Sequence, residues 1–318
     1  MSGDIVRRIR VSYGTAISLQ LKSARQDAPP TTAYLLWDTG CQGQCSFCPR
    51  QGEKNETDRL SRVTWPEADW EDVCRRLEAG QGDFRRICLQ TGWNDASRGE
   101  LRQRVQQLLA LGKPLCVTLH PSQVDLAEQL IESGVECIGI GLDAASPRTY
   151  AEHKGCDWAI DAPALEGLMR RKPGRIGVHL IFGLGDTEPE FLKTIDWVYS
   201  CGGKVGLFAL TPVSGAKQQV QPPKVGSWRR VQIFRYLRSL GAVGFQNCHF
   251  QDERLVSLQL SEEQLNELLK SGEAFRTAGC TDCNRPYYNE RPGGTMFNFP
   301  RPLAPAEVVK CRSEAELN

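Results

Sequence analysis

Six short apolar runs, each followed by a longer stretch with a helical pattern, dominate the hydrophobic pattern of this chain. Each run has the length of a buried parallel strand and lacks the polar alternation of a half-exposed one. The runs are Ala33–Trp37, Ile87–Gln90, Leu115–Leu119, Cys137–Leu142, Ile176–Phe182 and Val205–Leu210. Alternating strands and helices predict a parallel sheet with right-handed crossovers. Because a closed barrel needs eight such units, we expect an α/β fold with a partial (β/α)6 TIM-type barrel, the alternative being an open doubly wound sheet.

Capping patterns and apolar faces predict helices between these runs. Thr187 and Glu190 have capping-box spacing, and so do Thr64 and Glu67 around Pro66. Ser227 is expected to cap a further helix. One-sided apolar spacing, typical of amphipathic helices, occurs in Leu101–Leu109, Val124–Ile131 and Phe191–Val198.

The pattern changes at both ends of the chain, which predicts three segments. Residues 1–30 form an N-terminal extension with a short helix over Ala16–Leu21, and residues 31–245 form the barrel. Residues 246–318 form a C-terminal extension. There, Arg254–Leu260 alternates like a strand, Ser261–Lys270 has the pattern of a capped helix, and Gly279–Leu303 is rich in loop residues.

Composition adds constraints on the compartment and the partners. Of 318 residues, 40% are hydrophobic and 24% charged, and the net charge of +1 offers no overall field for nucleic acid or an anionic membrane. The N-terminal apolar stretch is short and interrupted, so we expect no signal peptide, no membrane span and a cytoplasmic location. In a reducing compartment, the thirteen cysteines are best interpreted as metal ligands and buried thiols.

Three of these cysteines lie close together after the first apolar run. Cys41, Cys45 and Cys48 share one loop with Gly40 and Gly43, which let the backbone turn tightly. Three thiolates hold three irons of a [4Fe–4S] cluster and leave the fourth iron open. Zinc is the main alternative, but a structural zinc site usually has four ligands and no partner pair follows nearby. Three unrelated buried thiols are the remaining interpretation.

This C-x-x-x-C-x-F-C motif after the first strand of a partial barrel resembles the radical S-adenosylmethionine (radical SAM) superfamily over about residues 31–245. The resemblance implies that the open iron binds S-adenosylmethionine and that its reductive cleavage gives a 5′-deoxyadenosyl radical, which abstracts a hydrogen atom from carbon. A low-potential electron donor is then also expected. The protein's own part in such chemistry is to position the reactants and exclude water.

The resemblance also suggests which residues contact S-adenosylmethionine. Phe47 is expected beside the adenine, whereas Thr91 and Gly92 stand where many members have a Gly-Gly-Glu motif for the amino group. His120 and Asp143 end the third and fourth strands, and each has an alternative role, as a histidine bonded to backbone or as a helix cap. The full candidate set is Phe47, Thr91, Gly92, His120, Asp143, Gly183 and Gly185.

A second motif, Cys280-Thr281-Asp282-Cys283, lies beyond the barrel pattern. Pro286 and Pro292 favour an irregular loop over the helix that usually follows a redox pair. We therefore expect an auxiliary [4Fe–4S] cluster on Cys280 and Cys283, with Cys248, or less favourably Cys311, as the third ligand. A zinc site with Cys248 and His249 is the alternative. We assign no role to Cys88, Cys116 and Cys137, which are interpreted as small buried hydrophobic residues.

The residues around this motif are similar to the biotin-synthase-related, two-protein lipoyl synthases. The matching segments are Ala274–Thr277, Asn284–Gly294, Gly14–Ile17 and Thr31–Tyr34. The resemblance implies sulfur insertion at C6, C8 or both of an octanoyl chain carried by a lipoyl domain, with sulfur from the auxiliary cluster and a paralogous subunit as partner. Arg285 and Arg291 are candidates for contacting a carboxylate or carrier surface, and Tyr287 and Tyr288 for lining an apolar chain. They have an equal alternative as a polar structural loop.

Two other functions remain open from the sequence. One is a biotin-synthase-like radical enzyme that acts on a small molecule, or a rearrangement in which the second cluster is inert. The other is a non-catalytic iron–sulfur or zinc module that serves an interface.

Overall fold

The parallel sheet predicted from the apolar runs is the centre of the fold. A computed structural model describes residues 8–50, 58–213, 216, 221–291 and 293–317. The sheet has the strand order β10-β9-β8-β7-β6-β2-β1-β5, and neighbours from β2 to β10 are parallel. In that order the strands are β10 (Lys204–Ala209), β9 (Ile176–Phe182), β8 (Cys137–Asp143), β7 (Leu115–Leu119), β6 (Arg86–Thr91), β2 (Thr32–Trp37), β1 (Arg8–Val11) and β5 (Glu67–Asp69). Six parallel strands in one curved sheet confirm the partial barrel.

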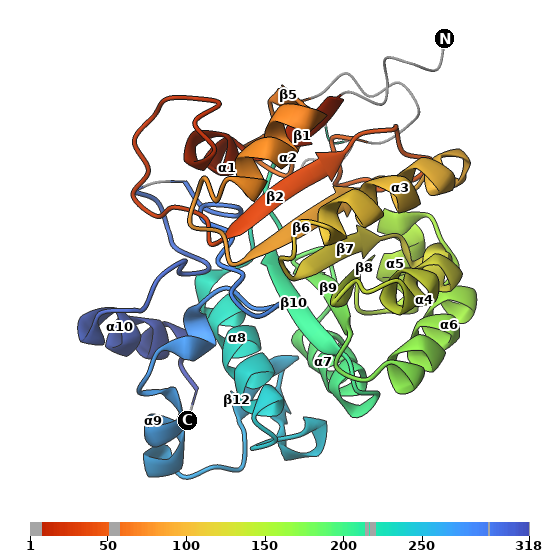
Figure 1. Ribbon diagram of the computed structural model, residues 1–318. Coiled ribbons are helices and arrows are strands. Elements are labelled where there is room, and N and C mark those ends of the chain that lie inside the picture. Colours follow the sequence, from red (N-terminus) through yellow and green to blue (C-terminus); the bar gives the residue numbers. More distant parts are fainter. Residues whose placement is uncertain (1–7, 51–57, 214–215, 217–220, 292, 318) are drawn as a thin grey trace.

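Helices pack along the outer side of the curved sheet (Figure 1). They are α2 (Trp70–Glu78), α3 (Arg98–Leu109), α4 (Val124–Glu132), α5 (Pro147–Lys154), α6 (Trp158–Arg171), α7 (Glu188–Ser200) and α8 (Val225–Ser239). The other elements are α1 (Tyr13–Ser18), β3 (Arg59–Leu60), β4 (Val63–Thr64), β11 (His249–Gln251), β12 (Arg254–Ser257), α9 (Glu262–Leu269) and α10 (Pro305–Ala315). None of the described helices is both long and apolar enough to span a membrane.

Capping patterns predicted two helix starts correctly and two wrongly. Thr187 and Ser261 form the expected capping boxes of α7 and α9. Thr64 caps no helix: it lies in β4, and α2 begins only at Trp70, capped by Asp69. Pairing of residues 67–69 with β1 uses the backbone groups that a helix start at Thr64 would need. Lys224, not Ser227, is the cap residue of α8.

Successive side chains of the central strands point alternately to the helix-packed core and to the barrel interior. On β6, Ile87 and Leu89 are fully buried against the helices, whereas Cys88 and Gln90 line an interior cavity. Successive strand residues point to opposite faces, so every second residue of each central strand faces the interior. The position of a cysteine along a strand therefore decides whether it packs in the core or faces the interior.

The C-terminal extension lies against the open side of the barrel (Figure 1). Helix α8 holds it through buried charges: Arg229 donates to the carbonyl oxygens of Met296 and Phe297, and Arg230 donates to that of Ala315. At its other end, Asn284 accepts a hydrogen bond from the backbone of Thr31 at 3.0 Å. The loop 277–290 is thus fixed between the first and last barrel strands.

Candidate active site

The loop with Cys41, Cys45 and Cys48 follows β2 and rests on the loop after β6. Gly40 has φ +82°, and the amide of Gln42 donates to the Trp93 carbonyl at 2.7 Å. A Cβ on Gly92 would lie 2.4 Å from the Gly40 carbonyl oxygen. Only glycine fits this approach, so the two loops form one floor under the cysteines.

All three cysteines line one cavity of about 220 Å³ at the C-terminal ends of the strands. No other cysteine in the described part of the chain lines it. Burial raises the pKa of Cys45 and raises that of Cys48 to about 12, and the nearby Lys154 ammonium opposes the rise. Three converging thiols beside a fixed positive charge fit a [4Fe–4S] cluster with one open iron.

Five of the predicted S-adenosylmethionine contacts lie around the same cavity: Phe47, Thr91, Gly92, His120 and Asp143. Gly183 and Gly185 do not line it. They occupy a turn after β9 at φ +116° and +114°, where Gly183 faces Leu210 and Pro223. Their positive φ angles account for the glycines without a ligand.

His120 has the structural role that was its alternative. Its Nδ1 lies 2.6 Å from the Ser122 hydroxyl and accepts from the Ser122 amide, so it caps a short 3₁₀ helix. The ring stacks on Trp93 at 4.4 Å between centroids, and burial lowers the pKa of His120 to about 2. A neutral imidazole stacked on Trp93 therefore forms part of the cavity wall.

Asp143 is held at the end of β8 by an ion pair with Lys154. It has φ +69°, and Ser146, not Asp143, caps α5. Lys154 is 5% exposed and also donates to the Gly141 carbonyl. The pair places one positive and one negative group beside Cys45, which suits a ligand that has both an ammonium and a carboxylate group.

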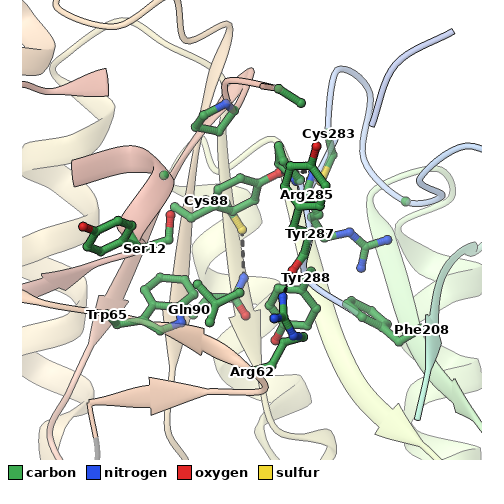
Figure 2. Close-up of a pocket in the computed structure, with 18 of the residues that line it drawn as sticks. Ser12, Arg62, Trp65, Cys88, Gln90, Phe208, Cys283, Arg285, Tyr287 and Tyr288 are labelled. Atoms are coloured by element: carbon green, nitrogen blue, oxygen red, sulfur yellow. Dashed lines mark hydrogen bonds between the residues drawn. The ribbon is translucent and has the colours of Figure 1, made fainter. Parts of the chain in front are cut away.

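Cys280 and Cys283 lie in the barrel interior, where a second cavity of about 480 Å³ contains further thiols (Figure 2). Cys88 and Cys116 line the same cavity. The Cys280 sulfur is 3.2 Å from that of Cys116 and 3.8 Å from that of Cys137. Five cysteines from three strands and the C-terminal loop are thus brought together.

Strand register explains why the three strand cysteines meet. Cys88 pairs with Cys116 across β6 and β7, and Cys116 pairs with Cys137 across β7 and β8. Tyr34 extends the row on β2, opposite Cys88. Sequence analysis missed this row, although Cys88 and Cys116 each come second in their apolar runs. Equal offsets in adjacent parallel strands were the available signal.

Positive groups and hydrogen bonds surround these thiols. The Cys116 thiol donates to Cys280, and this hydrogen bond is the main cause that holds the pKa of Cys280 well below its usual range. The Arg86 guanidinium lies 3.2 Å from the Cys116 sulfur. The Tyr34 hydroxyl is 3.3 Å from the sulfur of Cys283. These contacts favour a thiolate at Cys280, the form that binds metal, whereas burial raises the pKa values of Cys283 and Cys88.

The structure does not bring Cys248 to this group. It follows a 3₁₀ turn, with its sulfur 4.0 Å from the Gly244 carbonyl oxygen, and burial, helped by the nearby Asp196 carboxylate, raises the pKa of Cys248 to about 12. His249 is exposed and contacts Gln259. Cys311 is buried in α10. The strand cysteines, and neither Cys248 nor Cys311, lie beside Cys280 and Cys283, which the linear order of the chain does not reveal.

The loop after Cys283 is held by structural hydrogen bonds, and part of it also lines the interior cavity. Asn289 donates to the Ala209 carbonyl at 2.8 Å, and the buried Glu290 accepts from the Asn298 amide at 2.6 Å. These residues tie the loop to β10. Three of the four candidate substrate residues line the interior cavity: Arg285, Tyr287 and Tyr288. The fourth, Arg291, is exposed and does not line it.

The two cavities share part of their walls. Residues that line both are Gln90, Thr118, His179, Phe208 and Tyr288. A Cβ on Gly139 or Gly206 would lie 2.9 Å or 2.8 Å from the His179 ring, so these glycines make room for it. The two groups of cysteines therefore lie in adjoining cavities, separated by side chains that a ligand in either cavity can touch.

Comparisons with known proteins agree with this geometry. Residues 38–198 match the radical SAM superfamily. The chain is 24% identical over 212 residues to the mitochondrial biotin synthase of Arabidopsis thaliana, covering 64% of this chain and 53% of that protein. It is 24% identical over 220 residues to the biotin synthase of Synechococcus sp. (strain JA-3-3Ab), covering 63% of this chain and 67% of that protein. The chain thus spans about half to two thirds of the length of these relatives.

Solved structures show a similar fold at low sequence identity. The FeFe-hydrogenase maturase HydG from Carboxydothermus hydrogenoformans has a TM-score of 0.51 at 17% identity, covering 74% of this chain and 55% of that one. Methylornithine synthase (PylB) has a TM-score of 0.50 at 13% identity, covering 64% of this chain and 62% of that one. The superfamily match covers residues 38–198, which include the cysteine loop and four of the six parallel strands. With its three-cysteine loop over a partial barrel, the chain belongs to the radical SAM superfamily.

Proposed function

We propose that this protein is a lipoyl synthase subunit that inserts sulfur into the octanoyl chain of a lipoyl carrier protein. The observation that supports the proposal most is the pair of adjoining cavities, with three cysteines at one and five at the other. Sulfur insertion needs a carbon-centred radical and a sulfur source within reach of the same carbon. A barrel with cysteine groups in adjoining cavities meets this requirement.

The first group, Cys41, Cys45 and Cys48, would hold the cluster that binds S-adenosylmethionine. When bound, that pair of cofactors supplies the 5′-deoxyadenosyl radical. The chain's own contribution is position and exclusion of water. Phe47 and Trp93 border the cavity, while Lys154 and Asp143 face the cysteines with fixed charges.

The second group would hold an auxiliary [4Fe–4S] cluster as sulfur donor. Cys280 and Cys283 stay our proposed ligands, and the structure favours Cys116 and Cys88 as the residues that complete the set. Arg86 beside Cys116 would offset part of the negative charge of thiolate ligands. Cys137 is a further ligand candidate because its sulfur also approaches Cys280.

The wall between the two groups suits an apolar chain. Phe208 stacks edge-on to Tyr288 and His179, at centroid distances of 5.6 Å and 5.2 Å. The Arg285 guanidinium lies 3.9 Å from the Phe208 ring centroid, which fixes the ring from its other side. A methylene chain packed against these rings would be held with its carbons between the cavities.

The tail motif favours the lipoyl carrier as the substrate. The segment Asn284–Gly294, which resembles the two-protein lipoyl synthases, contributes residues to the interior cavity. A paralogous subunit and a low-potential electron donor are the partners that this proposal requires.

A biotin-synthase-like insertion into a small molecule is the second candidate. The two relatives named above are biotin synthases, and this likeness favours the second candidate. Both candidates use the same two cysteine groups, so the substrate must distinguish them.

The test is to incubate the reduced, cluster-loaded protein and S-adenosylmethionine with an octanoylated lipoyl domain, with and without the paralogous subunit. We expect the intact mass of the domain to rise by one or two sulfur atoms. An unchanged domain in both arms, together with thiolation of dethiobiotin in a parallel reaction, contradicts the lipoyl proposal and supports the second candidate.

A further inference from the structure

Tyr34 on β2 is a phenol at the end of a row of thiols. It stands at the same level of the sheet as the three cysteines on β6, β7 and β8. The tail motif meets this row at two places. Cys280 meets two of the strand thiols, at sulfur–sulfur distances of 3.2 Å and 3.8 Å, whereas Cys283 meets the Tyr34 hydroxyl at 3.3 Å. A hydroxyl thus takes, on Cys283, the place that thiols take on Cys280.

The direction of the hydrogen bond between Tyr34 and Cys283 follows from the partners of the hydroxyl. Its oxygen accepts a hydrogen bond from the Arg285 amide at 2.8 Å. A phenol also has one hydrogen to donate, and the Cys283 sulfur is the acceptor beside it. A cysteine that binds iron is a thiolate without a hydrogen of its own. In the loaded protein, Tyr34 is therefore the donor and Cys283 the acceptor.

The fold holds this pair in place and away from water. Tyr34 is 8% exposed and belongs to a small hydrophobic cluster against which Cys283 packs. The start of β2 also fixes the tail beside the ring, because the Thr31 amide donates to the Asn284 side chain at 3.0 Å. A hydrogen bond in such low-dielectric surroundings is electrostatically stronger than one at the surface. The contact between Tyr34 and Cys283 is thus a fixed feature of the interior.

We propose that Tyr34 is a positioning residue for sulfur transfer, which donates a hydrogen bond to Cys283 as a ligand of the auxiliary cluster. This inference rests on the proposed function and adds the residue that tunes its sulfur donor. When a carbon radical bonds to a sulfide, one sulfide electron completes the carbon–sulfur bond and a second one reduces a ferric iron. A donor to the thiolate withdraws negative charge from the ligand and so favours the state with the additional electron.

The cysteine group has a different kind of donor at Cys116. There the Arg86 guanidinium lies 3.2 Å from the sulfur and also pairs with Glu136 at 3.2 Å. Removing Arg86 would change the net charge of the site together with the hydrogen bond. Tyr34 is neutral, so its hydrogen bond can be removed or strengthened at constant charge, which makes it the donor that can be tested by itself.

The experiment measures the reduction potential of the auxiliary cluster alone. Cys41, Cys45 and Cys48 are replaced by Ala in the full chain, and the midpoint potential of the remaining cluster is followed by electron paramagnetic resonance. Tyr34→Phe removes the donor. Replacement of Tyr34 by 3-fluorotyrosine makes the hydroxyl more acidic and keeps its oxygen as an acceptor for the Arg285 amide. We expect the potential to fall with Phe and to rise with 3-fluorotyrosine.

Tyr287→Phe is the matched control, because Tyr287 lines the same cavity and its hydroxyl contacts none of the described cysteines. Its potential should equal that of the parent. Electron–nuclear double resonance of the reduced cluster should show an exchangeable proton that is lost in Tyr34→Phe and kept in Tyr287→Phe. With the first cluster present, Tyr34→Phe should insert sulfur about threefold to tenfold more slowly in a single turnover, the worth of a typical hydrogen bond.

Iron and sulfide content and the thermal midpoint show whether each variant is folded and loaded. If Tyr34→Phe loses its iron, the 3-fluorotyrosine protein decides, since it keeps the hydroxyl. An unchanged potential in that protein, or shifts of the same sign in both, would overturn the inference, because a merely structural role does not give opposite shifts. If the potentials stay unchanged while the octanoylated domain gains sulfur, the inference fails alone. Opposite shifts in a protein that adds no sulfur to the domain would leave the hydrogen bond established and contradict the proposed function.

Discussion

Gly92 is the residue with the least freedom in the radical site. Its α-carbon faces the Gly40 carbonyl so closely that an added Cβ would lie 2.4 Å from that oxygen. Gly92→Ala should push the cysteine loop away and destabilise the loaded protein by about 1 to 3 kcal/mol. We expect a lower iron content at the first cluster, measured on a variant that also lacks Cys280 and Cys283.

Gly99→Ala is the matched control for this prediction. No atom lies within 4 Å of a Cβ built on Gly99, which begins the first turn of α3. The control should retain full iron content and gain slight helix stability. Equal iron content in Gly92→Ala and Gly99→Ala would show that the close approach is not needed.

His179 gives the fold a dependence on pH. Burial, helped by the Arg285 charge, lowers the pKa of His179 to about 4, so the folded protein keeps the imidazole neutral. Below pH about 6.5 the unfolded chain binds a proton that the folded chain does not, so stability falls as the pH drops from 6.5 toward 4. The loss from this group should be about 1 to 3 kcal/mol.

Chemical denaturation of the cluster-free protein at pH 7 and pH 4.5 measures this loss, and His179→Asn serves as the comparison. The variant should lose less stability on acidification than the wild type does. Identical losses in the two proteins would mean that His179 does not provide the pH dependence.

Some site residues could be predicted from their local spacing in the sequence. Others could not, because only the register between strands brings them together. Cys41, Cys45 and Cys48 were found because their loop is contiguous in sequence. Cys88 and Cys116 were interpreted as core residues because burial on either face of a parallel strand looks alike in sequence. Only the register between strands places them opposite each other.

At the scale of elements, apolar runs predicted the six central strands to within two residues, whereas edge strands were missed. Strands β1 and β5 have few residues each and pair with each other, so they carry little pattern of their own. The Thr64 capping box was outweighed by this pairing. Long buried elements are thus encoded locally, whereas edge strands depend on their partners.

One buried ion pair joins α8 to α7 and, through Glu188, contacts the C-terminal extension. Arg230 and Glu188 are 6% and 7% exposed, with Nε and Oε2 3.0 Å apart, and Glu188 also accepts from the Leu255 amide. Arg230→Leu would leave this carboxylate unpaired, so we expect the free energy of unfolding to drop by about 3 to 5 kcal/mol.

The exposed pair between Arg170 and Glu166 provides the comparison, since its side chains are 58% and 37% exposed. Arg170→Leu should cost far less stability than Arg230→Leu, because water screens the exposed pair. Both values come from urea denaturation curves. Similar losses in the two variants would contradict a structural role for the Arg230 pair.

At the scale of the whole molecule, the C-terminal loop completes the barrel interior. The sequence identified Cys280, Cys283 and the polar residues behind them, but it could not show that this loop enters the barrel between Thr31 and Ala209. Contacts between residues about 250 positions apart leave no periodic signal. The proposed division into residues 1–30, 31–245 and 246–318 stays a prediction.

The central claim is that one cysteine group generates the radical and the other supplies sulfur. The most direct measurement follows both outputs in a protein with Cys280 and Cys283 replaced by Ala. We predict that the variant still forms 5′-deoxyadenosine from S-adenosylmethionine, whereas the intact mass of the octanoylated lipoyl domain shows no added sulfur. Sulfur added by this variant at the wild-type level would contradict the account.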